Sequence, residues 1–275
     1  MPGLIANNLD QSIFDYTINY TDGAHHARTI ASENIGKVDI VIAVGGDGTV
    51  NEVASGIVGS NTVLGVLPYG SGNGLSRFLG VPMDPAKAIR NINQWHVEAI
   101  DAGLADGRWF FNMAGMGFDA HIAEVFSRDG KRGFFTYVKS AFREVMNYKA
   151  DKYQLNIDGK LYEREAFMLS IANSSQYGNN AHVSPDASVQ DGLLDVCIIK
   201  PFPLWRFPEL GVRMFTKTAT GSKYLEIIKG KNIIINRAHE GPMHLDGEPH
   251  ISGATVEIKV VPASLRIIAG SSYKK

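Results

Sequence analysis

The first hundred residues alternate short apolar runs with glycine-rich turns and segments of helical periodicity. Residues 38–44 form a continuous, β-branched run, which is typical of a strand buried in a parallel sheet. The glycine-rich segment 45–48 follows directly, and a second apolar run, residues 62–67, leads into another such segment, residues 68–74. The pattern predicts an α/β layer in which both glycine-rich segments leave the same edge of the sheet, because the carboxyl ends of parallel strands lie together.

Polar residues indicate where the helices of this half begin. Thr49, with Glu52 three positions later, has the spacing of a capping box and predicts a helix start after the first glycine-rich segment. Asp84 before Pro85 predicts another start, since proline is favoured at the first helical position. The other elements expected here are a strand at residues 13–20, a helix at 24–34 and a strand at 97–104.

The character of the chain changes after residue 104. Strand-like runs separated by turns replace the strand–helix alternation, which indicates an antiparallel arrangement. We therefore predict an α/β plus β fold, with a parallel-sheet domain over residues 1–104 and a mainly antiparallel β domain over residues 105–275. One helix is expected in the second domain, at residues 134–148. The predicted strands are residues 108–113, 153–158, 166–172, 193–200, 232–237, 254–261 and 265–269.

Residues 201–220 are unusual because aromatic, basic and proline residues occur together there. We favour a buried connector helix for this segment. A lid that faces a membrane is the alternative, because Trp and Arg side chains together suit the headgroup region of a bilayer.

The two glycine-rich segments have the features of a phosphate-binding site. Free backbone N–H groups at a strand–glycine–helix junction bind anions, and two such junctions at one edge would act on the same ligand. The first segment lacks the G-x-G-x-x-G spacing, and no G-x-x-x-x-G-K-[ST] motif occurs in the chain. Asp47 would repel a phosphate there unless it handles a metal ion or a proton. Two tight turns that use glycine for steric reasons are the alternative.

Composition narrows the classes of function. The chain has 275 residues and a net charge of −1, which disfavours disorder and a general affinity for nucleic acid. The single cysteine, Cys197, lies in an apolar run and is expected to be a core residue in a reducing compartment. No stretch approaches the ~20 apolar residues of a membrane span, and the N-terminus lacks the apolar core of a signal peptide. We therefore expect a soluble, cytoplasmic protein.

The glycine-rich segments also carry a family resemblance. GGDGTVNEV followed by PYGSGNGLSR resembles the catalytic domain of the diacylglycerol kinases and sphingosine kinases, with the bacterial lipid kinases most similar and the NAD kinases more distant. The resemblance implies a three-layer parallel-sheet domain followed by a mainly antiparallel β-sandwich. It continues in order through FNMAGMGFDAHI (residues 111–122), DGLLDVCII (191–199) and HLDGEP (244–249).

The activity implied by this resemblance is that of an ATP-dependent lipid kinase that uses Mg²⁺. Such an enzyme transfers the γ-phosphoryl group to a hydroxyl of a diacylglycerol-like or sphingoid-like lipid at the membrane surface. The phosphate cradle would be formed by amides and hydroxyls of Gly45, Gly46, Gly48, Thr49, Gly70, Ser71, Gly72 and Asn73.

Acidic residues next to the shared motifs are the candidates for proton transfer and metal binding. In sphingosine kinases the base is the aspartate of the first loop, here Asp47, and in bacterial diacylglycerol kinases it is the glutamate of an LDGE-like motif, here Glu248. We favour Asp47 as essential and Glu248 as its partner across the cleft, either as the base or as a ligand for water or Mg²⁺. Asp191 resembles the aspartate that holds a structural Mg²⁺ in the bacterial kinases, and Asp101 is a second candidate ligand. Asp-Gly hairpin turns are the alternative for Glu248 and Asp191.

Two further points leave alternatives open. Lys131 and Arg132 are either solvated loop charges or phosphate-binding residues. Gly74 stands where bacterial diacylglycerol kinases usually have Asp, which weakens the assignment of diacylglycerol itself as the substrate.

The chain departs from the family at its start. Family members usually begin with a strand and an Asn-Pro-x-Ser-Gly loop that helps to hold the nucleotide. Nothing before Ile13 matches it, so we expect the first strand to be missing. The alternative functions are therefore a soluble NAD kinase-like phosphotransferase and a nucleotide- or lipid-binding homologue without turnover. A homodimer and peripheral attachment to the inner membrane face are left open.

Overall fold

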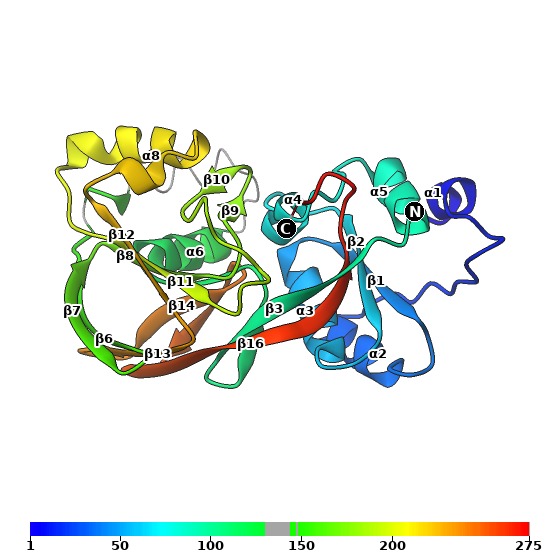
Figure 1. The fold of residues 1–275 in the computed structure, drawn as a ribbon, viewed down its shortest axis with the longest axis horizontal. Coiled ribbons are helices and arrows are strands. Elements are labelled where there is room, and N and C mark those ends of the chain that lie inside the picture. Colours follow the sequence, from blue (N-terminus) through cyan, green and yellow to red (C-terminus); the bar gives the residue numbers. More distant parts are fainter. Residues whose placement is uncertain (130–143, 147, 275) are drawn as a thin grey trace.

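The computed structural model describes residues 1–129, 144–146 and 148–274. The N-terminal unit has three layers, with a sheet between two layers of helices (Figure 1). Its helices are α1 (Pro2–Asn8), α2 (His26–Glu33), α3 (Asp47–Ile57), α4 (Gly74–Phe78) and α5 (Pro85–Asn93). Its sheet includes β1 (Ile40–Gly45), β2 (Val63–Pro68) and β3 (Val97–Ala105).

The central strand β2 is buried on both faces. It pairs in parallel with β1 from Ile40↔Val63 to Gly45↔Pro68. Leu64 and Val66 pack in a core formed with α2 and α3, whereas Val63 and Leu67 pack in a second core formed with α1 and α5. This alternation follows from the two-residue period of a strand and explains why the run in the sequence is continuously apolar.

The C-terminal unit is a β-sandwich of two mainly antiparallel sheets. One layer has the strand order β12-β11-β8-β5-β14-β15, and the other continues from the N-terminal sheet as β16-β13-β6-β7. Between them lies a core that contains Leu155, Leu169, Val196, Ile233 and Ile258. The strands are β4 (Arg108–Phe110), β5 (Met113–Gly117), β6 (Asp151–Ile157), β7 (Lys160–Ala166), β8 (Met168–Ala172), β9 (Gln176–Gly178), β10 (Ala181–His182), β11 (Leu194–Ile199), β12 (Leu225–Gly230), β13 (Asn232–Arg237), β14 (Gly241–Leu245), β15 (Glu248–Ser252) and β16 (Thr255–Ile268).

The long last strand connects the two units. The first part of β16 pairs with β13 in the sandwich, and its later residue Ile267 pairs in parallel with Leu64 of β2. β3 runs antiparallel to β16 along most of its length (Figure 1). C-terminal residues therefore complete the N-terminal sheet, and residue 104 falls at the end of β3.

The predicted fold class is confirmed, since a mixed parallel-sheet domain is followed by an antiparallel sandwich. Several predicted elements are wrong in detail. Residues 13–20 form no strand, and Ile13 and Tyr20 are 65% and 74% exposed. The run 108–113 is divided between β4 and β5, whereas 254–261 and 265–269 belong to one strand with an irregularity between Val261 and Leu265. The predicted helix 134–148 lies largely outside the described residues.

Helices cover the outer face of the six-stranded sheet. α6 (Phe118–Asp129) and α8 (Phe207–Phe215) lie there (Figure 1), and Phe118 and Ile122 pack in a third core with Phe207 and Met214. The short 3₁₀ helices η1 (Leu204–Arg206) and η2 (Ala219–Gly221) flank α8. Residues 201–220 do contain a helix, but the prediction that it is buried is wrong, because Leu210 is the one buried residue of α8.

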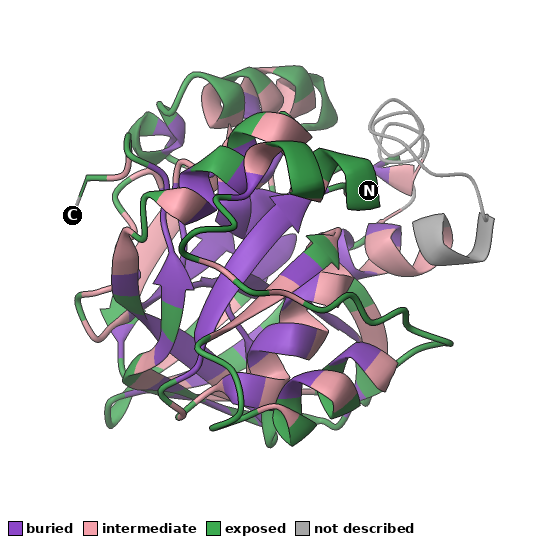
Figure 2. Cartoon of the chain, turned by 90° about the vertical axis from the view of Figure 1, so that its right-hand side faces the viewer, coloured by how far each residue is buried: buried purple, intermediate pink, exposed green. Residues whose placement is uncertain are grey.

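Burial is uneven along the chain. Figure 2 shows buried strands through the interior, whereas the helix at the N-terminus and the chain that follows it are largely exposed. None of the helices in the described part of the chain has the length and apolar character needed to cross a membrane.

Candidate functional site

The two glycine-rich loops lie against each other, backbone to backbone. The first follows β1 and the second follows β2, so both leave the same edge of the parallel sheet. A β-carbon added to Gly70 would lie 2.5 Å from the α-carbon of Gly46, which is too close for any side chain. Glycine is therefore required at this contact, and the predicted meeting of the two loops is confirmed.

Asp47 fixes the second loop to the first. Its Oδ2 accepts a hydrogen bond from the amide of Asn73, and its Oδ1 accepts one from the amide of Gly74, both at 2.8 Å. Burial raises the pKa of Asp47 above its ordinary value, although these amide hydrogen bonds oppose the shift. Both oxygens of this carboxylate therefore serve the shape of the second loop.

The second loop also closes on itself through Asn73. This residue has φ 51°, in the left-handed region that asparagine tolerates better than most residues. Its Oδ1 accepts the amide proton of Gly70 at 3.0 Å, and its Nδ2 donates to the carbonyl of Gly70 at 2.7 Å. Asn73 is thus a residue that shapes the loop.

The predicted capping box at Thr49 is wrong. α3 begins at Asp47, with extended Gly46 as its N-cap, three residues before the predicted N-cap Thr49. Thr49 lies in the first turn, where its side chain packs against Gly45. Glu52 instead accepts a hydrogen bond from the amide of His25 at 2.8 Å. Because Gly46 has no side chain, the N-cap supplies no acceptor to the first helical N–H groups, which favours an anion there.

Glu248 reaches the first loop from the sandwich. The Asp246–Gly247 turn joins β14 to β15 with φ 49° and 89°, the positive values of a tight hairpin turn, so the hairpin interpretation is correct for the backbone. Glu248 is the first residue of β15, and a β-carbon added to Gly48 would overlap its Oε1. Across the described residues this exposed carboxylate has no hydrogen-bond or ion-pair partner.

The side chain of Asp246 holds the Asp246–Gly247 turn, which precedes Glu248, at the junction of the two units. Its carboxylate is buried and accepts four N–H groups at 2.8–3.0 Å, from the Asn51 side chain and from the amides of Phe111, Asn112 and Met113. Burial raises the pKa of Asp246, against these hydrogen bonds. The sequence analysis missed this role, because an Asp-Gly pair is explained by the turn alone.

A buried polar cluster lies beneath the same turn. Asp119 Oδ2 accepts from Tyr177 Oη at 2.9 Å and from Ser170 Oγ at 3.2 Å, and it lies 3.2 Å from His244 Nε2. A β-carbon on Gly115 would overlap both Asp119 and His244. Two shared motifs, FNMAGMGFDAHI and HLDGEP, therefore meet here, which their order in the sequence did not indicate.

The two candidate metal ligands, Asp101 and Asp191, lie in segments that touch, but their carboxylates are bound to other groups of the protein. Asp101 Oδ2 accepts from the amide of Gly192 at 2.7 Å, and Asp191 Oδ2 lies 3.2 Å from Lys229 Nζ. Lys229 also pairs with Asp195 at 2.9 Å, so its ammonium group balances the charge of Asp191 and Asp195. In residues 1–129, 144–146 and 148–274, no three His, Cys, Asp or Glu side chains are grouped to hold a metal ion. Lys131 and Arg132 lie outside the described residues.

A hairpin of the sandwich packs on the second loop. Gly178, at the end of β9, lies so close that a β-carbon there would be 3.0 Å from the α-carbon of Gly72. The amide of Asn179 donates to the carbonyl of Gly72 at 3.3 Å. Both glycine loops are therefore contacted by the C-terminal unit, the first by Glu248 and the second by this hairpin.

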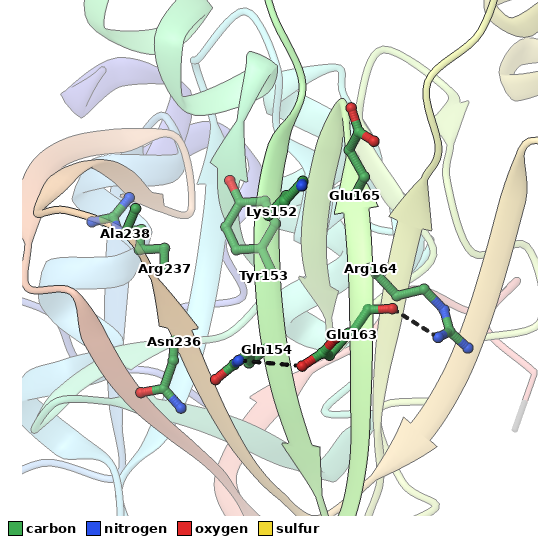
Figure 3. A pocket seen from close by; sticks show the side chains of 9 residues that line it. All are labelled: Lys152, Tyr153, Gln154, Glu163, Arg164, Glu165, Asn236, Arg237 and Ala238. Carbon is green, nitrogen blue, oxygen red and sulfur yellow. Dashed lines mark hydrogen bonds between the residues drawn. The ribbon is translucent and has the colours of Figure 1, made fainter.

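An open depression of about 510 Å³ lies on a different face, along β6, β7 and β13 (Figure 3). Its lining side chains pair with their neighbours: Gln154 donates to Glu163 at 3.3 Å, and Arg164 pairs with Glu226 at 2.9 Å. It contains none of the candidate site residues.

Comparisons with known proteins agree with this geometry. Residues 3–105 match the diacylglycerol kinase catalytic domain, and residues 112–269 match the YegS C-terminal NAD kinase beta sandwich-like domain. A "Probable lipid kinase YegS-like" of Klebsiella pneumoniae (strain 342) is 32% identical over 236 residues, covering 83% of this chain and 77% of its own. A diacylglycerol kinase of Bacillus subtilis (strain 168) is 27% identical over 232 residues, covering 82% and 76%.

A solved structure extends the similarity to the whole fold. The crystal structure of a "putative diacylglycerol kinase" from Bacillus anthracis str. Sterne superposes with a TM-score of 0.85 at 26% identity, covering 99% of this chain and 91% of that one. The chain therefore belongs to the family of lipid kinases in which a diacylglycerol kinase catalytic domain is followed by a YegS-type β-sandwich domain.

Proposed function

We propose that this lipid kinase transfers the γ-phosphoryl group of ATP to a hydroxyl of a diacylglycerol-like or sphingoid-like lipid. The observation that carries the proposal is the position of Glu248, whose carboxylate lies against Gly48 of the first glycine loop. A group that accepts the proton of the lipid hydroxyl is needed next to the phosphates, and Glu248 is the carboxylate available there.

The glycine loops would bind the phosphates through their amides. The N-terminus of α3 and the loop of residues 70–74 bring backbone N–H groups to one edge of the sheet, and close approach of a phosphate requires glycine there. Thr49 and Ser71 are the side-chain donors that we assign to the same cradle. Mg²⁺ carried by the nucleotide would supply neutralisation of the phosphate charge.

We assign different roles to the two carboxylates. Both oxygens of Asp47 accept amide hydrogens, so its contribution is to hold the second loop in its binding shape. Glu248 is exposed and has no competing partner in the described residues, so it is the better base. Asp47 remains essential, but as a positioning residue.

For a structural Mg²⁺ we propose Asp191 and Asp101. The two residues lie in segments that touch, since the amide of Gly192, next to Asp191, donates to Asp101. A bound ion would have to displace Lys229 from Asp191, so we expect weak binding. A rise in melting temperature on adding Mg²⁺ that Asp191→Asn abolishes would support this site, and this readout does not depend on activity.

The experiment that tests the proposed function uses a total lipid extract as substrate. The protein is incubated with ATP and Mg²⁺, and new phosphorylated lipids are detected by mass spectrometry. We expect a phosphorylated lipid in which the acceptor is a free hydroxyl, and about a hundredfold less of it with Glu248→Gln. In a parallel incubation with added NAD, a phosphorylated dinucleotide with no phosphorylated lipid would favour an NAD kinase-like activity instead.

A further inference from the structure

The segment from η1 to α8 has an apolar outer side. Its inner side packs on the sandwich through Leu210, Phe207 and Met214. On the outer side Leu204, Trp205 and Val212 are 47%, 69% and 61% exposed. A surface helix of a soluble protein normally presents charged and polar residues to water, so exposed apolar side chains on this segment need a reason.

The segment that carries this apolar surface has a net positive charge, although Lys200 pairs with Glu226 outside the segment. Residues 200–223 contain Lys200, Arg206, Arg213, Lys217 and Lys223 against the single acidic residue Glu209, a net charge of +4 in a chain whose total is −1. Arg206 and Arg213 both pair with Glu209, which neutralises that carboxylate. The guanidinium of Arg206 also lies 4.1 Å from the centre of the Trp205 ring.

We propose that the docking face, defined as Leu204, Trp205, Val212, Lys217 and Lys223, binds the surface of an anionic lipid bilayer. Apolar side chains and an indole enter the boundary between headgroups and acyl chains, and lysines are attracted by anionic headgroups. The proposal deepens the proposed function, on which it rests, because it identifies how the enzyme meets a lipid substrate.

The position of the docking face relative to the glycine loops suits this role. α8 packs on β10, and β10 pairs with β9 (Figure 1). Gly178 at the end of β9 contacts Gly72 of the second glycine loop. One hairpin therefore separates the docking face from the phosphate cradle, so a docked enzyme keeps its site beside the bilayer.

Binding is tested by sedimentation of the whole protein with vesicles, without ATP. Equal parts of phosphatidylglycerol and phosphatidylcholine should bind the parent, and phosphatidylcholine alone should bind it at least about fivefold more weakly. Leu204→Glu with Val212→Glu should weaken binding by about tenfold or more. Leu161→Glu on β7 is the matched control, since Leu161 is 80% exposed and lies on a different element; it should bind as the parent does.

The lysines and the tryptophan give two further readouts. Lys217→Glu with Lys223→Glu should weaken binding to anionic vesicles by about fivefold per lysine, and Lys160→Glu should not. Trp205 emission should shift to the blue on binding, and Trp205→Phe should remove that shift while the melting temperature stays unchanged.

Three outcomes would overturn the proposal that the docking face binds a bilayer. They are a parent that binds no vesicles, a Leu204/Val212 variant that binds as the parent does, and equal loss of binding in Leu161→Glu. Phosphorylation of lipid in detergent micelles by a parent that binds no vesicles would leave the proposed kinase activity standing and reject the docking face alone.

Discussion

The carboxylate of Glu248 lies against the backbone of Gly48, so a strand of the sandwich reaches the first glycine loop of the N-terminal unit. A β-carbon added at Gly48 would overlap Oε1 of Glu248. The absence of a β-carbon at Gly48 is thus what allows the Glu248 carboxylate to approach the first glycine loop.

Gly48→Ala should therefore impair catalysis more than folding. The obstructing atom is the end of a flexible side chain, so Glu248 can move away at little cost in stability. We expect a loss of turnover of about tenfold or more, with a small change in melting temperature. Gly23→Ala is the matched control, because a β-carbon there has no neighbour within 4 Å. Unchanged turnover in Gly48→Ala would show that the position of Glu248 does not matter.

Asp47→Asn should weaken nucleotide binding. Asparagine offers one acceptor oxygen, and its NH₂ group would face the amide of Asn73 or Gly74, so the second loop loses its anchor. We expect the dissociation constant for ATP, measured by calorimetry, to rise about tenfold. Asp39→Asn, on an exposed carboxylate just before β1, should leave it unchanged. A variant that binds ATP normally but has lost turnover would assign proton transfer to Asp47 instead.

Asp246→Asn should destabilise the protein and reduce activity together. Four N–H groups point at this carboxylate, and an amide cannot accept from all of them. The free energy of unfolding should fall by about 2 kcal/mol in urea titrations. Asp158→Asn alters the equivalent Asp-Gly turn between β6 and β7, where the aspartate accepts from Lys231 and Asn232. That control should lose some stability but keep full activity, and equal loss of activity in both would argue against a specific role for Asp246.

The ion pairs of Glu226 predict a pH dependence of stability. Hydrogen bonds from Arg164, and then Lys200, lower the pKa of Glu226 from 4.5 to about 2. A pKa that is lower in the folded state gives stability that is present above 4.5 and is lost as pH falls toward 2. Because the group is partly solvated, we expect roughly 1 kcal/mol.

The comparison that isolates this effect is the melting temperature at about pH 6 and about pH 3. The decrease should be smaller in Glu226→Gln than in the parent, since glutamine cannot be protonated in this range. Glu163→Gln, on the exposed carboxylate next to Arg164, should follow the parent. Identical decreases in Glu226→Gln and the parent would contradict the assignment.

The sequence predicted those parts of the site that depend on short stretches of chain, such as strands, glycine loops and helix caps. Continuous apolar runs end in glycine loops, and their parallel pairing follows from the α/β pattern, so the meeting of residues 45–48 with residues 70–74 could be expected. Asp84 caps α5 as predicted, accepting from the amide of Lys87. The prediction of a capping box at Thr49 failed because the N-cap is Gly46, three residues earlier, which has no side chain to signal a cap.

Long-range contacts could not be predicted in the same way. The four donors to Asp246 come from residues more than a hundred positions away, and a single sequence holds no sign of such pairing. β16 adds Ile267 to the N-terminal sheet after crossing the sandwich, which a domain boundary drawn from periodicity does not reveal. β7 was missed because its residues are largely exposed and charged, as on an edge strand.

The measurement that tests the central claim most directly is the turnover of Glu248→Gln. Formation of the phosphorylated lipid is followed by mass spectrometry in mixed micelles with ATP and Mg²⁺, and ATP affinity is measured in parallel. The account predicts that turnover falls by about a hundredfold or more while the ATP dissociation constant stays within about twofold, because Gln keeps the size but cannot accept the proton. Turnover at the parent's rate in Glu248→Gln would contradict it.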